Sequence, residues 1–372
     1  MMSSLRRILP ALLALLPLLV LHPAPAHASA GMELAVQDDD VFVYSSLAAR
    51  ERALKAAEKL GVTRIRVNVL WANTLGLAAR TRTAPRKPVY DFFNIDVLQQ
   101  EAALHHIALQ LTVAGPAPAW ATRNHRVGNT WPSAYRYGQF VTAVAEHFKG
   151  RIDRYSIWNE PNWDTWLNPA RHAPGIYRDL YTAGYKAIKA VDPDAKVLIG
   201  ETSPYGEKHA IPPLQFLRAL TCRTPRYTPA TRCAPLRADG YAAHAYQFTV
   251  APDRPFAGRD DAPFGSLRHL TSALDLLARR RALLTPTGHH LNVYLTEFGY
   301  LTKGSRALPA RTRAAWLTRA YHIARRNPRV KQFLQYQLVD GPARNPWHSA
   351  VMSRRLVPDA AFKALAKVAR RR

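Results

Sequence analysis

An alternation of short β-branched segments with longer helical segments constrains this chain most strongly, because it repeats eight times. In TRIRVNVLW, residues 63–71, the apolar side chains fall on one face and Arg66 on the other, a period of two that indicates a strand. The alanine-rich segment before it has helical spacing and a stop at Gly61. The expected strands are Met32–Val36, Arg64–Leu70, Ile107–Val113, Ile152–Trp158, Lys196–Ile199, Gly240–Ala245, Asn292–Thr296 and Phe333–Leu338. The expected helices are Leu47–Leu60, Ile95–His105, Tyr135–Phe148, Ile176–Ala190, Leu214–Leu220, Leu267–Arg281, Arg313–Arg326 and Pro358–Ala369.

Eight strands, each followed by a helix, are the count of a (β/α)8 TIM barrel, and a chain of this length fits that fold as one domain. A doubly wound open sheet is the alternative, but no glycine-rich phosphate loop follows the first strand. No linker or low-complexity stretch divides the chain after its first thirty residues. The sequence therefore predicts an α/β protein with a single (β/α)8 barrel over residues 31–372.

The first thirty residues have the pattern of a secretory signal peptide. Arg6 and Arg7 precede an apolar run, Ile8–Leu21, which small residues follow. The run is short for a bilayer span and is interrupted by proline, so an uncleaved anchor is the weaker alternative. We therefore expect residues 1–30 to be removed, and the mature protein to be secreted and to start near Gly31 without a further membrane span.

The chain has only two cysteines, Cys222 and Cys233, in a polar loop that contains prolines. In an oxidising compartment this pair is expected to form one local disulfide. A metal site would need further ligands close to them in the sequence, and none are clustered there. Neither a metal nor a cofactor is expected.

The charge of the chain is strongly positive, with 52 lysines and arginines against 26 acidic residues and a formal net charge of +26. The basic residues are spread along the chain, which favours attraction to anionic surfaces or polymers without identifying one. An arginine-rich composition that only aids solubility is the plainer alternative. No recognition helix, zinc finger or ribonucleoprotein motif indicates a nucleic acid. An anionic glycan or cell-envelope polymer is a hypothesis that the charge supports.

Two carboxylates end strands of the predicted barrel. Glu160, in IWNEPNW, follows the fourth expected strand, and Glu297, in LTEFG, follows the seventh. Because the carboxyl ends of barrel strands meet at one face, the two side chains can face each other across a cleft. Glycoside hydrolysis needs such a pair, one acid to protonate the leaving oxygen and one carboxylate to attack or to activate water. Either glutamate alone would also fit a solvated strand terminus.

The order of these motifs resembles clan A of the glycoside hydrolases, the "four-seven" barrels. WNEPN followed by TEFG is most similar to the family 39 and family 5 glycosidases, and the resemblance extends from the first strand to the last helix. It implies that Glu160 is the general acid/base and Glu297 the nucleophile. It also implies that Asn159 donates to the sugar 2-hydroxyl, and that anomeric configuration is retained through a covalent glycosyl-enzyme.

Three further positions match the same pattern. Arg66 lies on the inner face of the second strand, where an unpaired charge would be costly, and the resemblance gives it a hydrogen bond to Glu297. A purely structural ion pair is the alternative. His244 and Tyr246 share one face of the sixth strand and are implied to line the catalytic subsite, with satisfied core residues as the alternative.

Aromatic side chains supply platforms for sugar rings, because the apolar face of a pyranose stacks on an indole. Trp120 and Trp163 are the preferred candidates among several tryptophans, some of which belong to the core. The pattern departs from the clan on strand eight, where a tryptophan commonly forms the floor of the catalytic subsite. Tyr336, Gln337 and Trp347 are the candidates for that place.

The sequence as a whole predicts a secreted retaining O-glycosyl hydrolase that cleaves a polysaccharide or an oligosaccharide. Internal and terminal cleavage both stay open, with an open cleft and a polymer slightly favoured. Two hypotheses from other classes remain: a carbohydrate-binding barrel without catalysis, and a basic surface-adhesion protein whose function lies in its charge. A pure binding protein has no need for a matched acid and nucleophile, which favours the enzyme.

Overall fold

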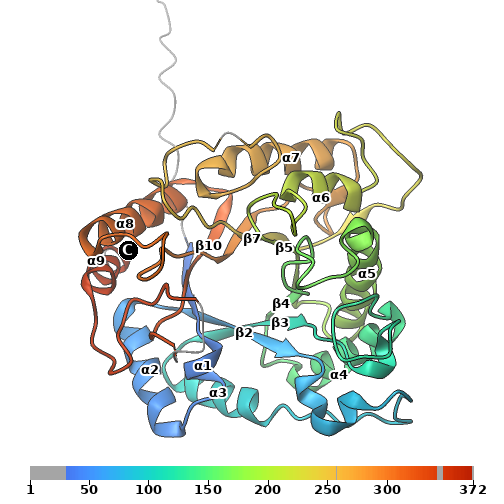
Figure 1. The fold of residues 1–372 in the computed structure, drawn as a ribbon, viewed down its shortest axis with the longest axis horizontal. Coiled ribbons are helices and arrows are strands. Elements are labelled where there is room, and N and C mark those ends of the chain that lie inside the picture. Colours follow the sequence, from blue (N-terminus) through green and yellow to red (C-terminus); the bar gives the residue numbers. More distant parts are fainter. Residues whose placement is uncertain (1–30, 257, 342–346, 371–372) are drawn as a thin grey trace, which may run out of the picture.

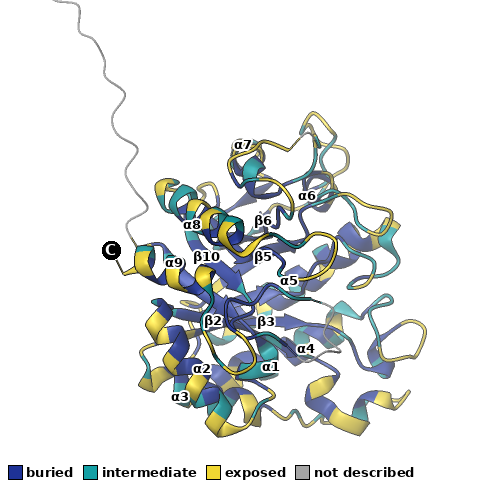
Figure 2. Cartoon of the chain, turned by 60° about the vertical axis from the view of Figure 1, so that its left-hand side comes forward, coloured by how far each residue is buried: buried dark blue, intermediate teal, exposed yellow. Residues whose placement is uncertain are grey.

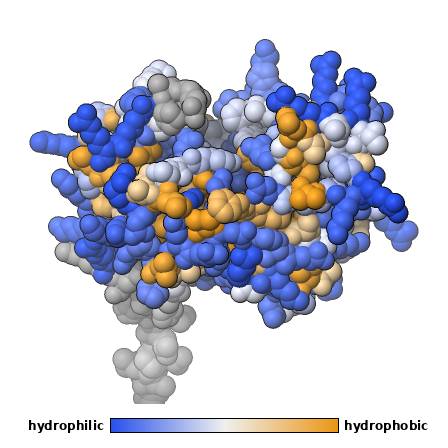
Figure 3. Space-filling model, turned by 90° about the horizontal axis from the view of Figure 1, so that it is seen from below, coloured by the Kyte–Doolittle hydropathy of each residue, from blue (hydrophilic) through white to orange (hydrophobic). Residues whose placement is uncertain are grey.

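The computed structural model describes residues 31–256, 258–341 and 347–370. The predicted signal peptide, residues 1–30, lies outside this part of the chain. Among the helices formed by the described residues, none is both long enough and apolar enough to cross a membrane. Hydrophilic side chains cover most of the face shown in Figure 3, with apolar side chains gathered in smaller patches between them.

Eight parallel strands close into a barrel, which confirms the expected fold (Figure 1). Around the barrel the strands follow the order β1-β10-β9-β7-β5-β4-β3-β2, so that β7, β9 and β10 are the sixth, seventh and eighth barrel strands. The barrel strands are β1 (Glu33–Gln37), β2 (Arg64–Leu70), β3 (Ala108–Ala114), β4 (Arg154–Ile157), β5 (Lys196–Thr202), β7 (Gly240–His244), β9 (Val293–Glu297) and β10 (Val330–Tyr336). A separate two-stranded sheet pairs β6 (Leu236–Arg237) with β8 (Leu283–Leu284).

Helices surround the barrel, with their buried residues facing it and their exposed residues facing solvent (Figure 2). The α-helices are α1 (Asp39–Phe42), α2 (Leu47–Leu60), α3 (Phe93–Leu104), α4 (Ala134–Phe148), α5 (Ala173–Val191), α6 (Pro213–Leu220), α7 (Leu267–Arg279), α8 (Ala310–Arg326) and α9 (Ala360–Ala369). Short 3-10 helices lie at Asn73–Arg80, Ala119–Ala121, Ala170–His172 and Phe264–Ser266.

Local sequence signals fix the ends of these helices. The Ser46 side chain accepts a hydrogen bond from the Ala49 amide at the start of α2, and Ser133 caps α4 in the same way. Gly61 ends α2 with a φ of 89°, the left-handed conformation that glycine adopts without steric cost. The chain can then turn directly into β2, as the sequence predicts.

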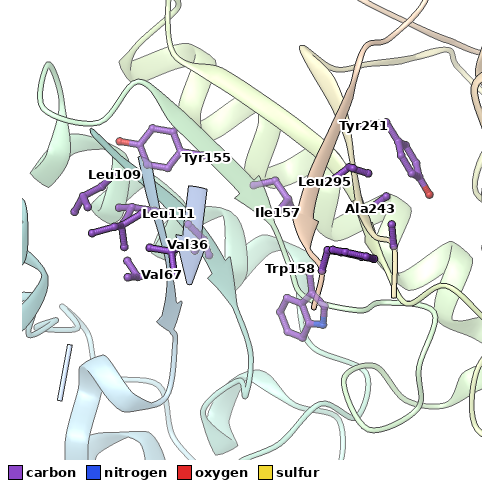
Figure 4. Close-up of a cluster of buried hydrophobic side chains, with 14 of the residues drawn as sticks. Val36, Val67, Leu109, Leu111, Tyr155, Ile157, Trp158, Tyr241, Ala243 and Leu295 are labelled. Carbon is purple, nitrogen blue, oxygen red and sulfur yellow. The ribbon is translucent and has the colours of Figure 1, made fainter. Parts of the chain in front are cut away.

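The inward and outward faces of the strands have different chemistry. Val67, Leu111 and Ile157 point outward into the apolar layer between the barrel and its helices (Figure 4). Burial of this layer provides the main drive for folding. The opposite face of β2 carries Arg66, which is fully buried inside the barrel. The barrel interior is therefore partly polar, and its polar residues determine the site described below.

The last barrel strand differs from its expected position. Apolar residues predict Phe333–Leu338, whereas β10 runs from Val330 to Tyr336. Its first half contains Lys331 and Gln332, which interrupt the apolar pattern. The Gln332 side chain accepts a hydrogen bond from Arg154 Nη1 at 2.8 Å inside the barrel, so the position is buried although it is polar. Hydrophobic periodicity does not identify such a position as part of a buried strand, because the buried residue is polar.

The predicted disulfide between Cys222 and Cys233 is present, in the loop that follows α6. Replacing both cysteines with serine is expected to lower the free energy of unfolding by about 2–3 kcal/mol, because the open loop regains conformational freedom in the unfolded chain. Thermal unfolding of the oxidised protein, the reduced protein and the double variant measures this effect. Equal melting temperatures for all three would contradict the prediction.

Candidate active site

A cavity of about 510 Å³ opens where the barrel strands end. Its walls carry several aromatic rings, and four acidic residues line it: Asp39, Glu160, Glu207 and Glu297. These residues come from loops, a strand end and the start of α1, which are far apart in sequence. Barrel closure brings them to the carboxyl-terminal face, which is the face that carries the chemistry in (β/α)8 enzymes.

Glu160 and Glu297 lie close together in this cavity. One carboxylate oxygen of each and a ring nitrogen of His244 all lie within 4.8 Å of one another. Glu297 is the last residue of β9, whereas Glu160 lies beyond the end of β4. Trp158 (φ 64°) and Glu160 (φ 36°) both have left-handed backbone, a costly conformation for non-glycine residues that clusters at functional sites.

Arg66 joins the candidate residues from inside the barrel. Its Nη1 donates to Glu297 Oε1 at 2.7 Å, and its Nη2 donates to Asn159 Oδ1 at 2.9 Å and to Glu201 Oε2 at 3.1 Å. Burial disfavours the cation, but the charges of Glu201 and Glu297 hold the pKa of Arg66 above its ordinary value. The guanidinium therefore stays charged and fixes the orientation of one Glu297 oxygen.

His244 lies between two carboxylates. Its Nδ1 is 2.9 Å from Glu160 Oε1 and its Nε2 is 2.8 Å from Glu201 Oε2. Burial lowers the pKa of His244, but the charge of Glu297 and the hydrogen bonds to the other two carboxylates outweigh it and raise the pKa to about 9. Both ring nitrogens then donate, so the side chain is an imidazolium cation. The ligand atoms of Glu160, His244 and Glu297 also lie close enough together to surround a metal ion. In this structure both ring nitrogens of His244 lie within hydrogen-bond distance of carboxylates instead.

Glu201 is a buried carboxylate that the sequence analysis did not single out. It lies in β5 with a φ of 50° and accepts hydrogen bonds from Arg66, His244 and, at 2.7 Å, from Thr296 Oγ1. Burial would raise its pKa, but the charge of Arg66 and the hydrogen bond from His244 lower it to about 2. Glu201 has the same sequence signal as Glu160, a carboxylate that follows an apolar strand. It was missed because the expected strand ended at Ile199, whereas β5 continues to Thr202.

The environment of Glu160 favours its protonated form. Burial is the largest influence and raises its pKa, while the hydrogen bond from His244 and its positive charge oppose the shift. A raised pKa allows a carboxyl group to carry a proton at a pH where glutamate is normally ionised. Asp39, which follows β1, is affected in the same way: burial raises its pKa to about 6, although Asn68 donates to it at 2.8 Å.

Tyr246 fixes the second oxygen of Glu297. Its hydroxyl donates to Glu297 Oε2 at 2.9 Å, while Arg66 holds Oε1. Burial and the charge of Glu297 raise the pKa of Tyr246 well above its ordinary value, so the hydroxyl keeps its proton. Two donors, one in β2 and one just after β7, thus hold the carboxylate of Glu297 in one plane.

Aromatic side chains line much of the cavity. Trp163 and Trp166, in the loop after Glu160, are two of them. The Trp347 ring, another, packs edge-on against Tyr246 at 5.0 Å and Tyr336 at 6.0 Å. The structure therefore brings Trp163, Tyr336 and Trp347 to one cavity, and their contact with a sugar stays a prediction.

Two predicted residues are placed elsewhere. Trp120 does not line the cavity: its ring packs edge-on against the buried Trp71, with 5.6 Å between centroids. The Gln337 side chain accepts a hydrogen bond from the Ser349 amide at 2.9 Å, is buried, and is not part of the cavity lining. Of the predicted residues on strand eight and the loop after it, Tyr336 and Trp347 line the cavity.

Replacing Glu201 with glutamine is expected to lower the free energy of unfolding by about 3–5 kcal/mol at pH 7, because Arg66 and His244 lose their shared buried counter-charge. Urea unfolding measures this, with Glu146→Gln on the exposed face of α4 as a control that should change stability by less than about 0.5 kcal/mol. The Glu201 pKa is lowered from 4.5 to about 2, so its contribution is present above pH 4.5. The two proteins should converge as the pH falls from 4.5 towards 2, and a pH-independent difference would contradict this account.

Comparisons with known proteins agree on the fold. No protein-family model matches the chain, and no curated protein matches it in sequence. A family 39 glycoside hydrolase from Bacteroides cellulosilyticus WH2 has a TM-score of 0.66 at 17% identity, over 91% of this chain and 63% of that one. A monomeric β-xylosidase from Caulobacter crescentus CB15 has a TM-score of 0.59 at 16% identity, over 92% and 69% of the two chains.

Xylanase 10B from Thermotoga petrophila RKU-1, solved with xylobiose, has a TM-score of 0.58 at 15% identity, over 92% of this chain and 94% of that one. At these identities the likeness shows a shared (β/α)8 barrel. This chain spans less than two thirds of the length of the Bacteroides protein. The expected resemblance to clan A barrels is thus confirmed at the level of the fold.

Proposed function

We propose that this protein is a secreted retaining glycoside hydrolase that acts on a polysaccharide or an oligosaccharide. The observation that carries the proposal is the placement of Glu160 just after the fourth barrel strand and of Glu297 at the end of the seventh, with carboxylate oxygens within 4.8 Å of each other. Retaining enzymes hold their two carboxyl groups about 5–5.5 Å apart, whereas inverting enzymes leave room for a water between them. The fold shared with glycosidases and a xylanase supports the same class.

In the first step Glu297 attacks the anomeric carbon and the bond to the leaving oxygen breaks. Glu160 gives its proton to that oxygen, and a covalent glycosyl-enzyme forms on Glu297. Arg66 and Tyr246 hold the attacking carboxylate in place before the reaction. Asn159, whose Oδ1 is held by Arg66, has its amide group available for the sugar 2-hydroxyl.

In the second step Glu160 takes a proton from a water molecule, which attacks the anomeric carbon and releases Glu297. Glu160 must therefore be stable both with and without its proton. The imidazolium of His244 stabilises the deprotonated form through the 2.9 Å hydrogen bond, while burial stabilises the protonated form. This balance fits a group that alternates between acid and base within one turnover.

A disulfide is present, and it is compatible with an oxidising compartment outside the cytoplasm. The aromatic walls of the cavity suit the apolar faces of sugar rings. We test the proposal by measuring release of reducing ends from a broad panel of β-linked, α-linked and anionic polysaccharides. The comparison is between the mature protein and a double variant, Glu160→Gln with Glu297→Gln. Release by the mature protein alone supports the proposal, and silence across the panel, with binding retained by both proteins, favours a carbohydrate-binding barrel.

A further inference from the structure

We propose that the cleft contains an anion subsite centred on Arg306, which binds a carboxylate or sulfate group on the sugar at the cleaved bond or on its neighbour. The inference rests on the proposed function and specifies its substrate class: an acidic glycan. Neither the pattern of strand-end motifs nor the shared fold assigns a role to this arginine. Its position, its lack of an ion pair and its chemistry each support the assignment.

Arg306 is connected to the reaction centre through two aromatic rings. It lies in the loop between β9 and α8, with its Cζ 4.2 Å from the ring centroid of Phe248. Phe248 stacks on Tyr246 with 5.4 Å between centroids and 11° between planes, and the Tyr246 hydroxyl donates to Glu297. All four residues line the same cavity. A substituent of a sugar bound at Glu297, or of the adjoining sugar, would therefore lie within reach of the guanidinium.

The guanidinium of Arg306 is available for a ligand. None of the ion pairs formed among the described residues includes it, whereas Arg66, the deeper arginine of the site, is paired with Glu201 and Glu297. The side chain is exposed and lies over an aromatic ring. Guanidinium N–H donors point outward in the plane of the group, so stacking of one face leaves them free for hydrogen bonds.

The carboxylates of the cavity do not prevent an anion from binding there. The charge of Glu297 is met by Arg66, and that of Glu160 by His244. Asp39 is partly buried and hydrogen-bonded to Asn68, and Glu207, the fourth acidic residue of the cavity lining, is exposed to solvent, which screens its charge. The formal net charge of +26 adds a long-range attraction for polyanions. The free cation at the wall and the positive charge of the whole chain therefore point to the same class of ligand.

A planar carboxylate suits this site best, because guanidinium and carboxylate groups form two parallel hydrogen bonds. A sulfate ester offers similar oxygen acceptors and is the other source of the same chemistry. Phe248, which lies beside Arg306, and Trp347, which packs edge-on against Phe248, supply apolar surface that suits a sugar ring. The site thus combines one charged donor group with a platform, as expected for recognition of an acidic sugar.

The test uses the full mature chain made inactive by Glu297→Gln, so that binding is measured without hydrolysis. The probes are size-matched oligosaccharides of galacturonate, mannuronate, hyaluronan and chondroitin sulfate, each with its carboxyl-reduced or desulfated counterpart. Further proteins add Arg306→Gln, Arg306→Lys, or the control Arg311→Gln, which removes a nearby exposed charge outside the cavity lining. Dissociation constants are measured by calorimetry at low and physiological salt.

We expect at least one acidic oligosaccharide to bind, and Arg306→Gln to weaken it about tenfold or more, the contribution of one charged hydrogen-bonding group. Arg306→Lys should keep part of the affinity, and Arg311→Gln should bind as the parent protein does. If carboxyl reduction of the probe weakens binding and abolishes the effect of Arg306→Gln, the group bound is a carboxylate; if desulfation does so, it is a sulfate. The inference is overturned if no acidic probe binds, or if Arg306→Gln and Arg311→Gln bind equally well.

Failure of this inference is distinguishable from failure of the proposed function. If the wild-type protein hydrolyses glycans of the panel but Arg306→Gln binds and cleaves acidic oligosaccharides as well as the wild type does, the glycosidase stands and the anion subsite falls. If acidic oligosaccharides bind through Arg306 but the wild-type protein cleaves none of them, the subsite stands and the hydrolase falls.

Discussion

Replacing Glu297 with glutamine is expected to reduce kcat/KM by at least about 10⁴-fold, which corresponds to about 5.5 kcal/mol of lost transition-state stabilisation. The amide has the shape of the carboxylate; its oxygen can accept from Arg66 and its NH2 group can donate to the Tyr246 hydroxyl, but it cannot attack the anomeric carbon. The loss should therefore be in kcat, with little change in sugar binding. Initial rates on the best substrate of the panel measure it.

The control for this prediction is Glu146→Gln, which removes a carboxylate from the exposed face of α4. It should leave kcat unchanged. Calorimetric binding of the substrate to the Glu297→Gln protein then separates a lost nucleophile from a damaged cleft. Residual activity of more than about a tenth of the wild-type value would show that Glu297 is not the nucleophile, because loss of a nucleophile lowers the rate by far more than tenfold.

Replacing Glu160 with glutamine is expected to have an effect that depends on the leaving group. For a sugar leaving group the loss should be roughly 10²–10⁴-fold, the usual contribution of general acid catalysis. With a dinitrophenyl glycoside as substrate, the dinitrophenolate group leaves without needing a proton. The first step, formation of the glycosyl-enzyme, should therefore be nearly unaffected. Deglycosylation then becomes limiting because water lacks its general base, and added azide should restore the rate.

The pH profile provides a second measurement of the same role. Burial raises the pKa of Glu160, so its proton-donating form should persist above the ordinary range of a glutamate. The alkaline limb of kcat/KM on a sugar leaving group should therefore lie above that range in the wild-type protein and disappear in Glu160→Gln. Equal losses on sugar and dinitrophenyl leaving groups would contradict the assignment of Glu160 as acid/base.

Much of the fold can be predicted from the sequence because two periodicities dominate it. The period of two in β2 and the helical spacing before Gly61 give correct elements, since these segments bury one apolar face each. The observed bounds of β10 differ from the expected ones because its first half carries the buried Gln332, which is hydrogen-bonded to Arg154 on another strand. A partner that is far away in sequence cannot be inferred from local periodicity.

The candidate site could be predicted only in part, because some of its residues have a local sequence signal and others do not. Glu160 and Glu297 stand in short motifs whose residue types match their chemistry. Glu201 carries only a weak local signal, and its role depends on Arg66 and His244, which come from other strands. Arg306 has no local signal at all, because an exposed arginine in a loop is common in so basic a chain. Only the closed barrel shows that it faces the cavity.

The tryptophans illustrate the limit of residue type as a guide. Trp120 and Trp163 have the same chemistry, yet Trp163 lines the cavity and Trp120 packs on Trp71. The direction of each ring is decided by the loop that carries it and by its neighbours in space. Aromatic content therefore predicts that a sugar platform exists without identifying which ring forms it.

The most direct test of the account is the stereochemistry of hydrolysis. A substrate found in the polysaccharide panel is cleaved in an NMR tube, and the anomeric proton of the first product is recorded before mutarotation. Carboxylate oxygens of Glu160 and Glu297 within 4.8 Å predict that this product has the same anomeric configuration as the substrate. A first product of inverted configuration would contradict a covalent intermediate on Glu297.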